Sequence, residues 1–180
     1  TVNSYISWLK DRGIEPAITA STGIAATHIS GYTIHAWSGI GIKDTLSSYE
    51  LDALSQNERL VKRVRSTPVL IIDEVSMLHH RTLDTVDAVL KSLRGSSRPF
   101  GGMQVVLVGD FFQLPPIEKR VQQVYDEYNQ DTNMFDGMFE DEALKSSFAF
   151  ESMAWKNMKL LTCYLSQQFR QEDPTFLDLL

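Results

Sequence analysis

Two adjacent carboxylates, Asp73 and Glu74, stand directly after the apolar run Val69–Ile72. Three of the four apolar residues are β-branched, which predicts a short strand buried on both faces, as in a parallel sheet. Ligands of open α/β sheets bind outside the carboxyl ends of the strands. There an Asp can hold Mg²⁺, usually through water, and a Glu can orient and deprotonate an attacking water. A solvated acidic turn is the plainer alternative for the same residues.

Two further polar clusters follow predicted strands. Ser21-Thr22-Gly23 comes after the stretch Ala17–Ala20, and Gly109-Asp110 with Gln113 comes after Gln104–Val108. Because parallel strands bring their carboxyl ends to one edge of a sheet, the clusters are expected to meet there. A Gln in that place can reach a terminal phosphate or the attacking water. Together the three clusters indicate a nucleotide and Mg²⁺ site more strongly than any one of them.

Strands alternate with helices along the chain, so the sequence predicts an α/β fold with a mostly parallel sheet flanked by helices. Apolar periodicity predicts helices over residues 2–12, 48–65 and 81–94, and a last strand over Leu160–Leu165. The end of the second helix is basic, with Arg59, Lys62, Arg63 and Arg65. These cations could face a phosphate backbone or simply form a solvated helix end, where the helix dipole favours them.

The length of 180 residues and the hydrophobic share of 43% fit one domain, or a large part of one. No apolar run reaches the roughly 18 residues that suggest a membrane span, so no membrane partner is expected. A single cysteine excludes an internal disulfide and fits a reducing, intracellular compartment. The net charge of −6 gives no bulk attraction to nucleic acid. Residues 121–147 are predicted to form an acidic surface insertion, with seven Asp or Glu and no Lys or Arg between Val121 and Leu144.

Several segments of the sequence closely resemble the petite-integration-frequency DNA helicases, 5′-to-3′ motors of superfamily 1 related to RecD and Dda. The segments are residues 19–26, 33–41, 72–78, 101–116 and 169–173, and the run Gly109–Pro116 is the most specific of them. The resemblance implies a RecA-like P-loop NTPase motor domain, the first of two between which ATP binds. It also implies an ATP-dependent helicase that acts on single-stranded DNA and DNA forks, in DNA repair, recombination or telomere maintenance. A monomer is expected.

The resemblance assigns roles at the nucleotide. Asp73 would hold Mg²⁺ and Glu74 would activate water, as the Walker B pair. Gln113 matches the glutamine of the third motif that senses the phosphate. Arg170 matches an arginine near the hinge to the second motor domain, and would reach the terminal phosphate. A local salt bridge is the alternative for Arg170, since Glu172 and Asp173 follow it.

The resemblance also assigns the single-stranded DNA path. Ser21, Thr22, Gly23, His35 and Trp37 fall in the motif that lines this path. Small polar side chains and His can bond phosphate or sugar, and an aromatic ring can stack on a base. Trp37 stands where the family more often has Phe, and packing in the core is its alternative role. Pro115 lies in a segment that is close to the DNA in the family, or it only stiffens a turn.

One departure from the family is large. The sequence contains no Gly-x-x-x-x-Gly-Lys-Ser/Thr, the loop whose backbone N–H groups and Lys cradle the phosphates. In the family this loop precedes the helix that begins here at Val2. We therefore expect residues 1–180 to be a partial motor domain whose sheet lacks the central strand before that loop, and which is inactive alone.

Three readings of the function stay open. In the first, the chain is part of an ATP-dependent helicase whose second RecA-like domain lies in the same parent chain. In the second, it is a RecA-like binding or structural module that has lost hydrolysis. In the third, it is part of a RecD-like recombination subunit. A helicase of this kind would be cytoplasmic in a prokaryote and nuclear or mitochondrial in a eukaryote.

Overall fold

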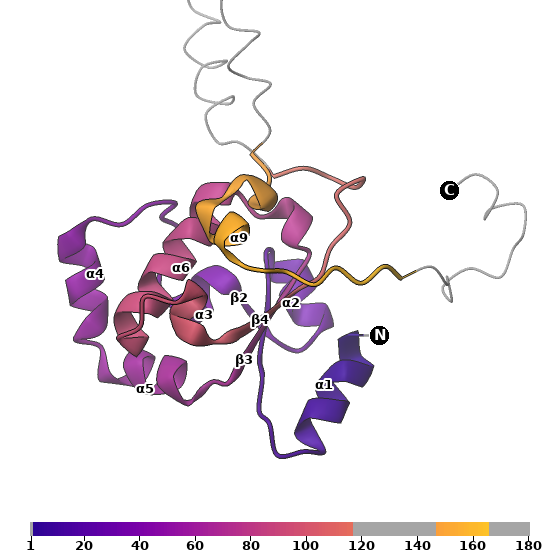
Figure 1. Cartoon of the computed structure of the whole chain (residues 1–180), viewed down its shortest axis with the longest axis horizontal. Helices are drawn as coiled ribbons and strands as arrows, with labels where there is room; N and C mark the ends of the chain where they lie inside the picture. The colour runs from indigo at the N-terminus through magenta and orange to yellow at the C-terminus, as the bar shows by residue number, and fades with distance from the viewer. Residues whose placement is uncertain (1, 117–146, 166–180) are drawn as a thin grey trace, which may run out of the picture.

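The computed structural model of the chain describes residues 2–116 and 147–165 (Figure 1). Its centre is a parallel four-stranded sheet in the order β2-β1-β3-β4. The strands are β1 (Ala17–Ala20), β2 (Tyr32–Thr33), β3 (Val69–Asp73) and β4 (Gln104–Leu107). The predicted α/β class with a parallel sheet is confirmed.

Helices and short 3-10 turns connect the strands. The helices are α1 (Val2–Lys10), α2 (Gly23–His28), α3 (Ile34–Ser38), α4 (Ser48–Ser55), α5 (Glu58–Ser66), α6 (His80–Arg94) and α9 (Met153–Asn157). The 3-10 turns are η1 (Val75–Met77), η2 (Pro99–Gly102) and η3 (Ala149–Glu151). The predicted first and third helices are thus confirmed, and α6 ends at Gly95, whose φ of 63° is the left-handed geometry of a helix C-cap.

β3 is covered on both faces, as its apolar run predicts. Leu70 and Ile72 belong to the larger core, which α3, α5 and α6 complete, whereas Val69 and Ile71 pack on the other face with residues of α1. Figure 1 shows the same layers, with α1 on one side of the strands and α5 and α6 on the other. All four residues are at most 3% exposed. The strand that carries the carboxylates is therefore held in place by packing on both of its faces.

Two predicted elements are wrong. The helix expected over residues 48–65 is two helices, because Asn57 starts a new one: its side chain accepts a hydrogen bond of 3.1 Å from the N–H of Leu60. The strand expected over Leu160–Leu165 is irregular chain with exposed residues. An apolar run becomes a strand only if a sheet edge is in reach, and that is decided by distant parts of the chain.

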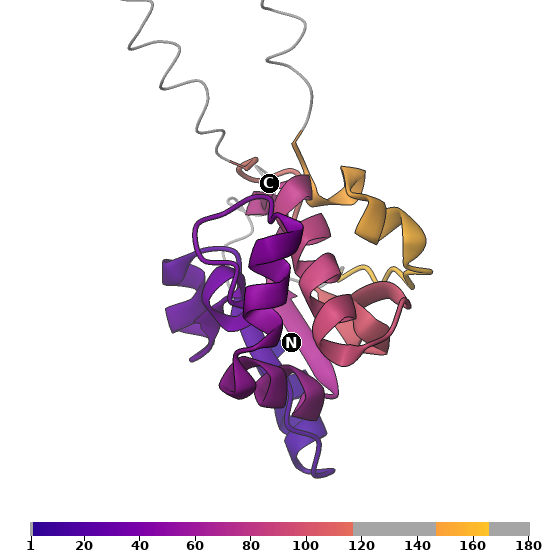
Figure 2. The ribbon, with the colours of Figure 1, turned by 90° about the vertical axis from the view of Figure 1, so that its left-hand side faces the viewer.

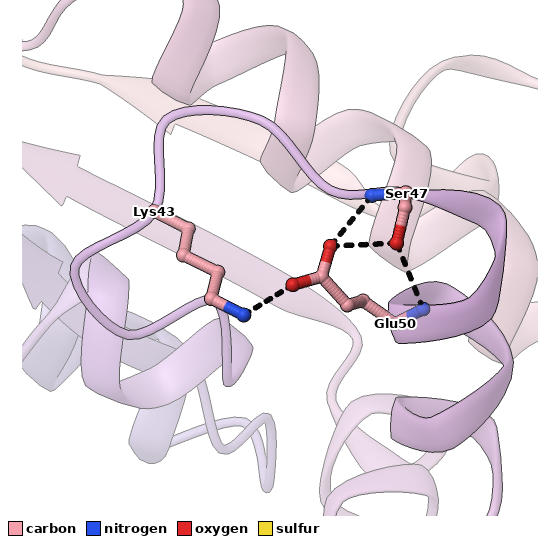
Figure 3. A network of polar contacts seen from close by, with 3 residues as sticks. All are labelled: Lys43, Ser47 and Glu50. Carbon is pink, nitrogen blue, oxygen red and sulfur yellow. Dashed lines mark hydrogen bonds and ion pairs between the residues drawn. The ribbon is translucent and has the colours of Figure 1, made fainter.

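A network of polar side chains fixes the start of α4 (Figure 3). Ser47 accepts a hydrogen bond from the N–H of Glu50, and the carboxylate of Glu50 accepts from the N–H of Ser47, which together form a capping box. Lys43 forms an ion pair with the same carboxylate. The ammonium of Lys43, followed by the bonds from Ser47, lowers the pKa of Glu50 from 4.5 to about 2. The N-terminus of α4 is therefore fixed by a capping box and an ion pair.

The acidic insertion expected at residues 121–147 lies outside the described residues, apart from Ser147. Within the described ranges no helix is long and apolar enough to cross a membrane.

Candidate functional site

The two carboxylates lie at the carboxyl end of β3, where the chain turns sharply. Glu74 has a φ of 52° and a ψ of 43°, left-handed values that a residue with a side chain adopts at a cost of order 1–3 kcal/mol. Its N–H donates to the carboxylate of Asp73 over 3.0 Å. Both side chains are partly buried. Backbone strain of this kind concentrates at functional sites, where the surrounding structure holds one geometry.

The end of β4 is bonded directly to this turn. The N–H of Val108 donates to the carbonyl of Ile72 over 2.9 Å, and the N–H of Val75 donates to the carbonyl of Val108 over 2.9 Å. At Gly109 an added Cβ would lie 3.0 Å from the backbone nitrogen of Val75 and 3.1 Å from that of Ser76. Glycine is therefore needed at 109, because it lets the two chains approach closely.

A short turn after Gly109 presents Gln113. The N–H of Gln113 donates to the carbonyl of Asp110 over 3.2 Å, and its side-chain amide donates to the Asp110 carboxylate over 3.2 Å. The same carboxylate accepts the N–H of Phe112 over 3.0 Å. Asp110 and Gln113 are both exposed. Asp110 therefore orients Gln113 at the same edge of the sheet as Asp73 and Glu74.

The third cluster, at the end of β1, is joined to the first. The N–H of Ser21 donates to the carbonyl of Asp73 over 3.1 Å. Thr22 is the N-cap of α2 and accepts a hydrogen bond of 3.2 Å from the N–H of Ala25, so its hydroxyl is engaged locally. The hydroxyl oxygens of Ser21 and Ser76 are buried and have no hydrogen-bond partner among the described residues. Buried polar atoms are nearly always satisfied; of these two, the Ser21 oxygen belongs to a partly exposed residue, whereas Ser76 is fully buried.

α3 starts at the same edge, because β2 is parallel to β1 and ends in register with it, Thr33 beside Ala20. His35, in its first turn, is partly exposed. Trp37 is only 4% exposed and packs in the larger core. The structure thus favours the packing role for Trp37, because an indole enclosed by the core has little face left for a base.

Two of the four basic residues near the end of α5 bond to backbone carbonyls of neighbouring helices. The guanidinium of Arg63 donates to the carbonyls of Trp37 and Ala36, the second over 3.4 Å, and so satisfies the end of α3. Arg65 donates to the carbonyl of Leu93 over 2.8 Å. These two arginines hold helices together. Arg59 and Lys62 remain exposed.

The structure therefore brings together most of the residues that the sequence nominates. Asp73, Glu74, Gln113, the cluster Ser21–Gly23 and His35 share the carboxyl edge of the sheet. Pro115 is exposed, two residues beyond Gln113. Trp37 faces the core instead, and Arg170 lies outside the described residues.

Three roles were not predicted from the sequence: Arg63 as the partner of the α3 carbonyls, Asp110 as the partner of Gln113, and the role of Phe111, considered below. The Asp-x-x-Gln spacing was the available signal for Asp110, since residues three apart meet in a turn.

The donor set fits a nucleotide with Mg²⁺. Across residues 2–116 and 147–165, no group of three or more His, Cys, Asp or Glu is placed to hold a metal ion. Mg²⁺ does not need one, because it keeps several waters and takes one or two carboxylates plus phosphate oxygens. Asp73 would supply such a carboxylate, and Ser21, whose hydroxyl is unpartnered among the described residues, follows Ala20, the residue in register with Asp73.

Comparison with known proteins agrees with this geometry. The family model described as PIF1-like helicase matches residues 2–133. The ATP-dependent DNA helicase Pif1 of Psychrobacter is 49% identical over 96% of this chain and 23% of its own length, and the helicase RRM3 of Saccharomyces cerevisiae is 40% identical over 91% and 20%. The chain thus spans about a quarter or less of these curated relatives.

Solved structures give the same result. The crystal structure of Pif1 helicase from Candida albicans matches with a TM-score of 0.79 and 36% identity, over 99% of this chain and 36% of that one. Bacteroides Pif1 bound to single-stranded DNA matches with a TM-score of 0.71 and 32% identity, over 96% and 37%. A Bacteroides Pif1 in complex with ADP-AlF3 and single-stranded DNA matches with a TM-score of 0.67 and 33% identity, over 89% and 34%. The chain has a RecA-like fold and belongs to the PIF1-like helicase family.

Proposed function

We propose that the full-length protein is an ATP-dependent DNA helicase that translocates 5′ to 3′ on single-stranded DNA and unwinds forks as a monomer. Residues 1–180 form part of its first RecA-like motor domain, and a second such domain follows in the same protein. One observation carries the proposal. In a chain of this family, the carboxylates of Asp73 and Glu74, the Gln113 turn and the Ser21–Gly23 cluster meet at one sheet edge.

The β3 and β4 side of this edge serves the nucleotide. Asp73 holds Mg²⁺, which when bound neutralises charge on the phosphates. Glu74 takes the proton of the attacking water, and Gln113, oriented by Asp110, reaches the terminal phosphate or that water. Arg170 supplies a guanidinium to the terminal phosphate, where its planar fork binds two oxygens at once. The Bacteroides Pif1 complex with ADP-AlF3 supports nucleotide use by this fold.

The β1 and β2 side serves single-stranded DNA. Ser21, Thr22, Gly23 and His35 line the strand from this side, and Pro115 lines it from beyond the Gln113 turn. Contact is mostly to the backbone with little sequence preference. The net charge of −6 makes a broad electrostatic attraction ineffective, so local contacts carry binding. The Bacteroides Pif1 structure with single-stranded DNA supports single-stranded DNA as the ligand of this fold.

Substitution Glu74→Gln in the full-length protein tests the proposal. Gln keeps the size of the side chain but cannot accept the proton, so DNA-stimulated ATP hydrolysis should fall by about 10²–10⁴-fold while ATP binding persists. The exposed Glu58 of α5 provides the matched control, Glu58→Gln, which should hydrolyse ATP like the wild type. In the same assay Arg170→Ala should lower the rate by about 10³-fold or more, and Arg170→Lys should restore little of it.

Two results would count against the proposal. Wild-type turnover by the Glu74→Gln protein would remove Glu74 as the base. A full-length wild-type protein that binds single-stranded DNA but hydrolyses no ATP would favour the binding-module reading instead.

A further inference from the structure

Phe111, in the turn between Asp110 and Gln113, packs into three other aromatic rings. Its ring centroid lies 5.7 Å from that of Phe148, 5.0 Å from that of Phe150 and 5.9 Å from that of Trp155, each in an edge-to-face arrangement. Phe148 and Phe150 stack on each other at 5.2 Å. Edge-to-face pairs at these distances are the favoured geometry of aromatic contacts. We call these four residues the aromatic clamp.

The three partner rings stand on a segment that is fastened to α6. The N–H of His80 donates to the carbonyl of Ser147 over 3.0 Å, and His79 forms a bridge with Phe148. Further along, the N–H of Ala154 donates to the carboxylate of Asp84 over 2.7 Å. Figure 2 shows this gold segment running alongside α6. The clamp is therefore anchored to the helix that follows the Asp73–Glu74 turn.

Within the turn, Phe111 is the residue that holds the chain to the rest of the molecule. Its neighbour Phe112 is fully exposed, at 102%, and Asp110 and Gln113 are exposed too. On the side nearer β4, Gly109 has no side chain, and an added Cβ would meet Val75 and Ser76 of the turn after β3. Fixing an exposed turn costs conformational entropy, and the contact of the partly buried Phe111 ring with its three aromatic neighbours offsets it here.

We propose that Phe111 is a positioning residue: through the aromatic clamp it holds the Asp110–Gln113 turn in place beside Glu74. The inference rests on the proposed hydrolytic role of Gln113 and Glu74. Phe111 itself touches no substrate. Its effect on turnover is indirect, because a misplacement of about 1 Å at a reacting group can lower the rate by about 10²-fold.

Phe111→Leu in the full-length protein tests this, because Leu fills apolar space but has no ring edge. The matched control is Phe100→Leu: Phe100 is fully buried in the same core but lies in η2, before β4, at the opposite end of that strand. Phe111→Leu should lower kcat of DNA-stimulated ATP hydrolysis by about 10- to 100-fold and leave KM for ATP near wild type. Phe100→Leu should lower the melting temperature and leave kcat near wild type when assayed well below it. Phe111→Tyr, which keeps the ring, should restore kcat.

A crystal structure of the Phe111→Leu protein gives a second readout, independent of turnover. Gln113 should move by about 1 Å or more relative to Glu74. The inference is overturned if Gln113 stays in place, if kcat is unchanged, or if Phe100→Leu lowers kcat as much. A wild-type protein without ATP hydrolysis would instead refute the proposed function, and the position of Gln113 would still decide whether Phe111 holds the turn.

Discussion

At the scale of single residues, Trp37 shows how position decides the role of an amphipathic side chain. An indole buries about 150–250 Å² and also offers a π-face to a base. α3 starts at the functional edge, but the side chain of Trp37 packs in the core, where it is 4% exposed. The neighbouring His35 of the same helix keeps part of its surface at the edge. One short helix therefore combines a DNA-facing candidate with a core anchor.

We predict that Trp37→Ala lowers the free energy of unfolding by about 3–5 kcal/mol, as usual for a large aromatic removed from a core. Trp37→Phe should cost clearly less, since a ring still fills most of the site. Thermal melting of the full-length protein, followed by single-stranded DNA titration at a temperature where all variants are folded, provides the measurement. A loss of DNA affinity in folded Trp37→Ala, with affinity kept in Trp37→Phe, would restore the stacking role.

At the scale of elements, the start of α4 is stabilised by charge. The folded pKa of Glu50, about 2, lies below its ordinary value of 4.5, so this carboxylate stabilises the folded state above about pH 4.5. That contribution is lost as the pH falls from about 4.5 towards 2, because the proton must return. Lys43 is the main cause, and its ion pair is exposed to solvent, so the effect is sensitive to salt.

We predict that Glu50→Gln lowers the melting temperature at neutral pH, and that the difference from wild type shrinks below about pH 4.5. Melting curves of both proteins from pH 3 to 7 measure this. Lys43→Gln is the matched control, since it removes the main cause of the lowered pKa and should weaken the pH dependence. A difference that stays constant across that range would show that Glu50 acts through the shape of its capping box and not through its charge.

Local patterns in the sequence predict the elements whose stability is local. The β-branched run before Asp73 correctly predicts β3, and the glycine at 95 correctly predicts the C-cap of α6. The start of a new helix after Asn57 could have been predicted, because Asn is a preferred N-cap. The apolar periodicity continues across Asn57, however, and therefore favours one long helix. The irregular conformation of Leu160–Leu165 could not be predicted from the local sequence, since strand pairing depends on distant residues. The same holds for Phe111, whose partners lie more than 35 positions along the chain.

At the scale of the whole molecule, the strand order divides the functional edge. The DNA candidates Ser21–Gly23 and His35 follow β1 and β2, whereas the nucleotide candidates follow β3 and β4, with Pro115 beyond them. The hydrogen bond from Ser21 to the carbonyl of Asp73 joins the halves at the border between β1 and β3. A shift of either half therefore reaches the other through the neighbouring strands β1 and β3.

Because Phe111 contacts Trp155, the fluorescence of Trp155 can report the position of Phe111. Of the three tryptophans, Trp37 is enclosed, Trp8 is 48% exposed beneath the guanidinium of Arg12, and Trp155 belongs to the aromatic clamp. Indole emission shifts with local polarity, so a displacement of Phe111 alters the light that Trp155 emits.

We predict that a non-hydrolysable ATP analogue changes the emission of Trp155 in the full-length protein. Subtracting the spectrum of the Trp155→Phe protein from that of the wild type isolates this one indole. Without nucleotide, Phe111→Leu should shift the isolated spectrum to longer wavelength, because water gains access to the ring. If the Trp155 spectrum is the same with and without nucleotide and in Phe111→Leu, the surroundings of Trp155 do not respond to Phe111. Native fluorescence thus offers a stopped-flow signal for the chemical cycle that needs no dye.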